Sequence, residues 1–161
     1  MIKINHARLL GLLHDFAQFG KTENNGVTRL ALSDEDKLAR DYFIKLATQA
    51  GFSVKVDAIG NIFVRREGKR AQLAPILIGS HGDSQPLGGR YDGIYGVLAG
   101  LEVLLSLNQH RIETAHRVFP MRCSFGIPPQ PKQKAGFSLP HLFVVFAGII
   151  FAACRVTYIA R

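Results

Sequence analysis

Two segments in the first third of the chain have the hydrophobic spacing of amphipathic helices. The first covers residues 6–18 and ends near Gly20. The second begins at Ser33, a residue type favoured at a helix N-cap, and stops at Gly51. Three acidic residues follow Ser33, and we interpret them as helix-start chemistry rather than as a metal site. The apolar positions of the two segments are Leu9, Leu10, Leu12, Leu13, Phe16 and Leu38, Tyr42, Phe43, Leu46, Ala47, Ala50.

The middle of the chain changes to the spacing of β-strands. Apolar and polar residues alternate over residues 52–56, and a short apolar run at 62–64 follows a Gly-Asn turn, which predicts a strand pair. Residues 75–79 form a continuous apolar run of the kind that is buried on both faces of a sheet. The segment 92–108 is apolar on nearly all sides, which predicts a helix buried against that sheet. The order α, α, β, β, β, α implies a layered α/β fold.

Three residues with metal-binding chemistry lie between the apolar run at 75–79 and the following helix. His81 and Asp92 are candidate ligands for Zn²⁺, Mn²⁺ or Co²⁺. Asp83 comes two residues after His81, so on an extended segment both side chains point the same way. Asp83 could therefore hydrogen-bond and orient the imidazole of His81, as carboxylates behind metal-bound histidines do. Asp92 stands at the expected N-cap of the helix.

Other interpretations of these residues stay open at this point. Polar loop residues satisfy backbone groups more often than they bind metals, and an Asp at a helix start is usually a cap. His6 and His14 are more simply explained as surface or packing residues than as ligands.

Three motifs resemble those of one enzyme family. They are GSHGDSQPLGGRYDGIYGVLAG at residues 79–100, GVTRLAL at 26–32 and VDAIGN at 56–61. The sequence over residues 5–113 is similar to the N-carbamoyl-L-amino-acid amidohydrolases, with β-ureidopropionase and allantoate amidohydrolase as relatives. These enzymes belong to the dinuclear-metal aminoacylase and M20-type peptidase superfamily.

The resemblance implies a layered α/β/α catalytic domain of the zinc-peptidase type and hydrolysis of linear carbamoyl or ureido amide bonds in a small-molecule substrate. It implies a divalent metal cofactor, two ions per site (Zn, or Mn/Co), with His81 on one metal, Asp92 bridging both, and Asp83 as the catalytic residue that orients the site. Substrate-binding residues are not assigned. The family also uses an Asn-Glu-Glu-Gly motif for a general base and a metal ligand, two later histidines, and an inserted lid domain that forms a homodimer.

The character of the sequence changes after Glu113. Residues 114–161 contain no Asp or Glu, and they supply six basic residues to a net charge of +8. Prolines break the segment, the apolar run at 142–154 is shorter than the roughly 18 residues that a membrane span needs, and the two cysteines lack ligand-like spacing. We expect two parts: 1–113, the N-terminal part of the catalytic domain, and 114–161, an aberrant tail that packs poorly against it and is plausibly translated out of frame.

These patterns predict a truncated metal-dependent amidohydrolase that lacks its general base and several metal ligands and is therefore inactive. The alternatives are a non-enzymatic pseudogene remnant and a protein with a membrane-associated C-terminal tail. The basic charge lies mainly in the tail and has no aromatic-basic interleaving, so we expect no nucleic-acid partner. The N-terminus lacks the pattern of a signal peptide, which predicts a cytoplasmic location, and homodimerisation is not expected without the lid domain.

Overall fold

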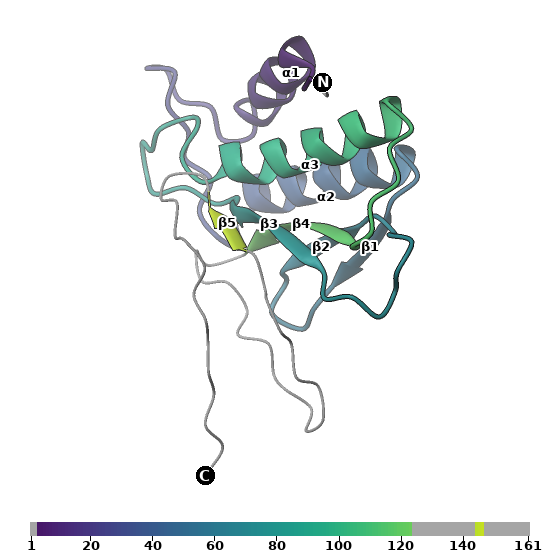
Figure 1. Cartoon of the computed structure of the whole chain (residues 1–161). Coiled ribbons are helices and arrows are strands. Elements are labelled where there is room, and N and C mark those ends of the chain that lie inside the picture. The colour runs from purple at the N-terminus through teal and green to yellow at the C-terminus, as the bar shows by residue number, and fades with distance from the viewer. Residues whose placement is uncertain (1–2, 124–143, 147–161) are drawn as a thin grey trace.

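The computed structural model describes residues 3–123 and the strand at 144–146 (Figure 1). Three helices and five strands follow one another in the order ααβββαββ. They are α1 (His6–Phe16), α2 (Asp34–Gln49), β1 (Ser53–Val56), β2 (Ile62–Arg65), β3 (Ile76–His81), α3 (Ile94–Gln109), β4 (Val118–Cys123) and β5 (Val144–Phe146).

The five strands form one sheet in the order β1-β2-β4-β3-β5. The pairs β1–β2 and β2–β4 are antiparallel, whereas β3 pairs in parallel with both β4 and β5. The three helices lie together on one side of this sheet (Figure 1). The predicted mixed α/β architecture is therefore confirmed. A second helical layer, as in an α/β/α arrangement, is not found within the part of the chain that the structure describes.

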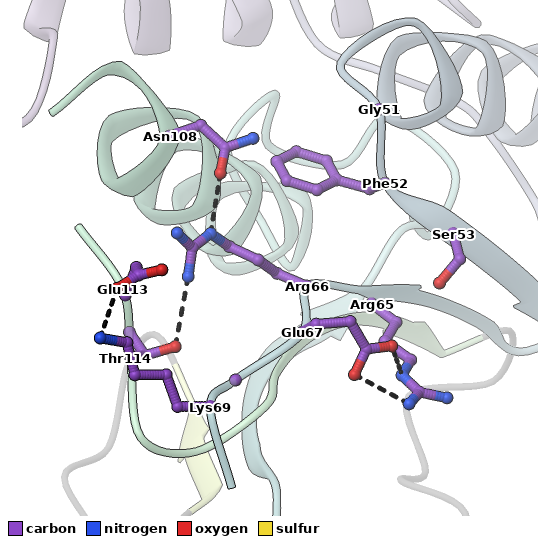
Figure 2. Close-up of a pocket in the computed structure, with 11 residues that line it drawn as sticks. Gly51, Phe52, Ser53, Arg65, Arg66, Glu67, Lys69, Asn108, Glu113 and Thr114 are labelled. Atoms are coloured by element: carbon purple, nitrogen blue, oxygen red, sulfur yellow. Dashed lines mark hydrogen bonds and ion pairs between the residues drawn. The ribbon is translucent and has the colours of Figure 1, made fainter. Parts of the chain in front are cut away.

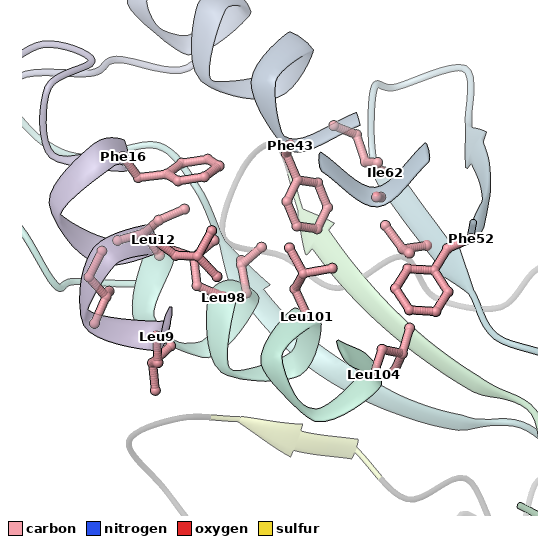
Figure 3. Close-up of a cluster of buried hydrophobic side chains, with 14 of the residues drawn as sticks. Leu9, Leu12, Phe16, Phe43, Phe52, Ile62, Leu98, Leu101 and Leu104 are labelled. Atoms are coloured by element: carbon pink, nitrogen blue, oxygen red, sulfur yellow. The ribbon is translucent and has the colours of Figure 1, made fainter. Parts of the chain in front are cut away.

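The hydrophobic core lies between the helices and the sheet (Figure 3). Phe16 of α1, Phe43 of α2 and Leu104 of α3 are fully buried there, against Ile62 and Val64 of β2. Two residues that we assigned to the apolar stripes, Leu10 and Leu38, are instead exposed. No helix within residues 3–123 is long and apolar enough to cross a bilayer.

The turn between β1 and β2 explains one of the three sequence motifs. The carboxylate of Asp57 accepts hydrogen bonds from the amides of Ile59 and Asn61 and from the side chain of Asn61. Burial alone would raise the pKa of Asp57, but these hydrogen bonds outweigh it and lower the pKa. The predicted strand pair around a tight turn is confirmed, and this motif has a structural role.

The acidic residues at the start of α2 differ in what they do. Ser33 caps the helix as predicted, since its hydroxyl accepts from the Asp36 amide. Asp36, however, is buried and forms an ion pair with Arg122 of β4, which is also fully buried. Asp36 therefore has two roles: its carboxylate accepts from the Leu32 amide at 3.2 Å at the start of the helix, as predicted, and it also joins α2 to the sheet through Arg122.

The prediction that residues 114–161 pack poorly against 1–113 is wrong for residues 118–123. They form β4, which pairs in register with β3 from Ile76–Val118 to His81–Cys123 and is mostly buried. The short β5 also pairs with β3, from Leu77–Val144 to Gly79–Phe146. Residues 124–143 and 147–161 of the predicted tail, which include most of the apolar run at 142–154, lie outside the described residues.

The Asp36–Arg122 ion pair gives a test of how β4 is docked. Replacing Asp36 by Asn leaves the buried guanidinium of Arg122 without its counter-charge, which we expect to lower the free energy of unfolding by about 3–5 kcal/mol. Chemical denaturation measures this change. The control is Asp34→Asn in the same helical turn, where the side chain is exposed and the cost should stay within about 1 kcal/mol. Equal effects of the two substitutions would show that β4 is not held by this pair.

Candidate functional site

His81 lies at the end of the central strand, as predicted. It is the last residue of β3, and the chain leaves the sheet at Gly82 and returns to regular structure at Ile94, the first residue of α3. The strand–loop–helix connection places His81, Asp83 and Asp92 at the carboxyl end of β3, where α/β proteins commonly carry their sites.

The imidazole of His81 lies between the two aspartates. Its Nδ1 is 3.0 Å from the carbonyl oxygen of Asp83, and its Nε2 is 4.0 Å from Oδ2 of Asp92. Because a carbonyl oxygen only accepts, this contact requires a proton on Nδ1. In the neutral ring the lone pair is then on Nε2, which faces Asp92. This is the orientation that a histidine needs to bind a metal through Nε2.

Asp83 orients the His81 ring through its backbone carbonyl, whereas the sequence pattern suggested a hydrogen bond from its carboxylate. Its carboxylate Oδ1 is 3.6 Å from Nδ1 of His81, which is longer than a hydrogen bond. Among the described residues, this buried Oδ1 has no hydrogen-bond partner. A buried carboxylate oxygen normally has a partner, so the unpaired atom is compatible with a metal or a metal-bound ligand nearby.

Asp92 is not the N-cap of the following helix. The N-cap is Gly93, at φ +65°, and α3 begins one residue later than the pattern predicts. The side chain of Asp92 is 63% exposed and carries no cap hydrogen bond, so its carboxylate is free to accept another partner. A Cβ atom on Gly93 would be only 2.4 Å from Cε1 of His81, so the ring of His81 rests on the backbone of Gly93.

The described residues supply too few ligands for a complete metal site. No group of three or more His, Cys, Asp or Glu side chains suited to an ion occurs within residues 3–123. Glu102 is buried and engaged by the side chains of Arg8 and Ser106, so it cannot serve as a third ligand. His81 and Asp92 fit a divalent ion as two of its ligands, but they do not enclose it.

A second loop holds the site loop in place, and sequence reasoning assigned it no role. Val27 and Gly88 exchange two backbone hydrogen bonds of 2.9 Å each, and the amide of Ser84 donates to the carbonyl of Arg29 at 2.7 Å. The buried side chain of Arg29 donates to the carbonyl of Gly82 at 2.7 Å. The GVTRLAL motif therefore packs against the loop that carries Asp83. The motif was the only sign in the sequence that this loop matters, because its contacts are with residues far away in the sequence.

A pocket lies at the other end of the sheet, where Arg66 pairs with Val118 and not near Cys123, the partner of His81. Figure 2 shows the residues that line it. The pocket has a volume of about 570 Å³ and is lined by residues around Arg66, which follows β2. The charges there are internally paired, Arg65 with Glu67 and Lys69 with Glu113. Arg66 donates to Asn108 and Thr114 and to the carbonyl of Ile112. The pocket shares no residue with the His81 loop, so we do not assign it to the candidate metal site.

Comparison with known proteins finds relatives of one enzyme family, although no family model matches the chain. An N-carbamoyl-L-amino acid amidohydrolase from Geobacillus stearothermophilus is 39% identical over 115 residues, 71% of this chain and 28% of that protein. A ureidoglycolate hydrolase from Oryza sativa is 41% identical over 97 residues, 60% of this chain and 20% of that protein. The crystal structure of a hydantoinase/carbamoylase family amidase from Burkholderia ambifaria matches with a TM-score of 0.73 and 51% identity, over 75% of this chain and 30% of that one.

Over about three quarters of its length, the chain is similar to amidohydrolases of the hydantoinase/carbamoylase family. It spans less than a third of the length of the family members that it matches. The predicted recognition is confirmed, and so is the fold class. The individual roles of His81, Asp83 and Asp92 within this family fold stay predictions.

Two glycines of the loop allow a test of the packing under His81. Alanine at Gly93 would strain a positive φ and push against the imidazole, so we expect a loss of about 1–3 kcal/mol in the free energy of unfolding and a displaced His81 ring. Alanine at Gly89 meets nothing within 4 Å and should be nearly neutral. Denaturation and the NMR signals of the His81 ring measure both effects. An unchanged ring signal in Gly93→Ala would contradict this packing.

Proposed function

We propose that the described part of this chain carries one portion of the metal centre of an amidohydrolase. The substrate class is N-carbamoyl amino acids or related ureido compounds, whose linear amide bond is hydrolysed. The support is the similarity to relatives named for N-carbamoyl amino acids and for ureidoglycolate. The single observation that carries a metal role is the His81 ring, held at Nδ1 and presenting Nε2 towards Asp92.

In this proposal His81 and Asp92 would be ligands of a divalent metal, either Zn²⁺ or Mn²⁺/Co²⁺. The bound metal would supply an activated water and polarise the scissile carbonyl. The chain's own contribution is to orient ligands: the carbonyl of Asp83 fixes the tautomer of His81, and its carboxylate adds negative charge beside the ring. Asp83 is the residue that we propose to be required for catalysis.

We further propose that this chain is inactive by itself. A catalytic zinc usually has three protein ligands and a water, and a dinuclear site needs more. The sequence after Glu113 contains no Asp or Glu that could act as the missing ligand or general base. The same observation favours the second candidate function, a non-enzymatic remnant of a family member.

The division at residue 113 and its explanation by a shifted reading frame also remain proposals. Because β4 pairs in register with β3, any change of frame must leave a sequence able to form that strand. The nucleotide sequence past the codon for His116 tests the idea directly. A frame that restores an Asn-Glu-Glu-Gly motif would support it, and an intact frame with no such alternative would reject it.

The metal proposal predicts weak binding that depends on His81. Calorimetric titration of the 161-residue chain with Zn²⁺ should detect binding, and His81→Ala should weaken it at least about tenfold. The matched control is His110→Ala. His110 is exposed just after the C-terminal end of α3, about 24 Å along the helix from Ile94 at its start, so its loss should leave binding unchanged.

Turnover separates an enzyme from a remnant. We expect no release of ammonia from an N-carbamoyl-L-amino acid above the His81→Ala background, with Zn²⁺ or Mn²⁺ present. Turnover above that background, with metal bound stoichiometrically, would show that the chain completes a site that we have not assigned. Equal Zn²⁺ binding by the wild-type chain, His81→Ala and His110→Ala would reject His81 as a ligand.

A further inference from the structure

Arg29 is a buried cation whose side chain contacts the site loop directly. It is 2% exposed, yet its guanidinium has three backbone partners. Nε donates to the carbonyl of Gly82 at 2.7 Å, and Nη1 donates to the carbonyls of Phe16 and Phe19 at 2.9 and 3.0 Å. The last turn of α1 leaves carbonyls without helical partners. Arg29 thus links the end of α1 to the residue next to His81.

The backbone of Arg29 makes a second connection to the same turn. Its amide donates to Oγ of Ser84 at 2.9 Å, and its carbonyl accepts from the Ser84 amide at 2.7 Å. The Ser84 hydroxyl also donates to the carbonyl of Val27 at 3.0 Å. Gly82 and Ser84 are therefore both held by Arg29, and they flank Asp83 on either side.

Asp83 is the residue whose carbonyl holds Nδ1 of His81. Its carbonyl can keep that direction only while the peptide units on both sides are fixed. The Arg29 side chain fixes the unit before it through Gly82, and the Arg29 backbone fixes the unit after it through Ser84. The chain of contacts thus runs from Arg29 to Gly82 and Ser84, to the Asp83 carbonyl, and to the His81 ring.

The charge balance also favours a fixed guanidinium at this position. Burial and, to a lesser extent, the nearby charge of Arg122 lower the pKa of Arg29 to about 10, although the charges of Asp36 and Asp83 act in the opposite direction. Arg29 thus stays protonated near neutral pH.

We propose that Arg29 is a positioning residue for the metal site: by holding Gly82 and Ser84 it keeps the Asp83 carbonyl on Nδ1 of His81 and leaves Nε2 free for a metal. This inference rests on the proposed metal role of His81, but its first consequence, the tautomer of the His81 ring, exists without metal. A residue that only stabilised the fold would lower stability without changing that tautomer.

The test compares Arg29→Lys with Arg66→Lys. Lysine keeps the charge but cannot bond Gly82 and α1 simultaneously with the planar fork of arginine. Arg66 is the matched control, because it also donates to a backbone carbonyl and to two side chains. Arg66 pairs with Val118 at the start of β4, whereas His81 pairs with Cys123 at its end, so the two sites are about 17 Å apart along the strand.

Four measurements are made on the full chain. ¹⁵N NMR at about pH 8, where a free imidazole is neutral, reports the tautomer of the His81 ring. Amide exchange of Ser84 and Gly88, thermal unfolding and Co²⁺ titration report the order of the loop, the stability and the metal affinity. In Arg29→Lys we expect loss of the single Nδ1–H tautomer, faster exchange at both amides and a Co²⁺ affinity about 10–100-fold lower. In Arg66→Lys we expect a lower melting temperature with an unchanged His81 ring, loop exchange and Co²⁺ affinity.

Three outcomes decide the matter. A folded Arg29→Lys variant with the wild-type His81 tautomer and Ser84 protection overturns the proposal. If Arg29→Lys does not fold, Ser84→Ala removes one contact of the same set, and a wild-type tautomer in that variant also overturns it. If the wild-type chain binds no Co²⁺, the proposed metal function fails, while the tautomer and exchange results still decide whether Arg29 positions His81.

Discussion

The parallel pairing of β3 with β4 is the constraint on which the rest of this structure depends. Parallel neighbours cannot be joined by a tight turn, so the chain crosses back through α3, which covers the face of the sheet. The pairing brings the backbones very close at Gly79, where a Cβ atom would lie 2.1 Å from the carbonyl oxygen of Met121. Any larger residue would force the strands apart. The register that follows places His81 at the open end of the sheet and Asp92 immediately before α3.

The spacing of apolar residues and the capping residues predicted the helices and strands that depend on interactions between residues close in the sequence. The two amphipathic helices, the strand pair around Asp57–Asn61 and the buried strand ending at His81 all occur where spacing and capping residues indicated. The predicted N-cap of α3, Asp92, is off by one residue, because Gly93 adopts a positive φ and is itself the N-cap. The approach of His81 to Asp92 followed from strand–loop–helix order alone, since a short loop must return to the same edge of the sheet.

Features that depend on distant partners could not be predicted. Pro120 argued against a strand, because proline cannot donate to a sheet, yet β4 is central. The structure accommodates Pro120 because the pairing of β4 with β2 covers only Met121 and Arg122. Asp36 looked like an ordinary first-turn acid until Arg122 was brought beside it from 86 positions away. Arg29 looked like a loop residue, and only the folded chain shows which carbonyls it holds.

The ion pair between α1 and α3 makes the N-terminal helix sensitive to acid. Glu102 is 1% exposed and accepts from Arg8, from the amide of Asn5 and from Ser106. Burial acts to raise the pKa of Glu102, but these hydrogen bonds and the Arg8 charge lower it overall. Its contribution to stability is therefore complete above the ordinary carboxyl pKa of about 4.3 and is lost as pH falls through the lowered value. Since Arg29 holds the other end of α1 at Phe16, loosening of this helix by acid would carry to the loop beside His81. Amide exchange in α1 and in residues 82–88, followed as the pH is lowered, would show the two segments opening together.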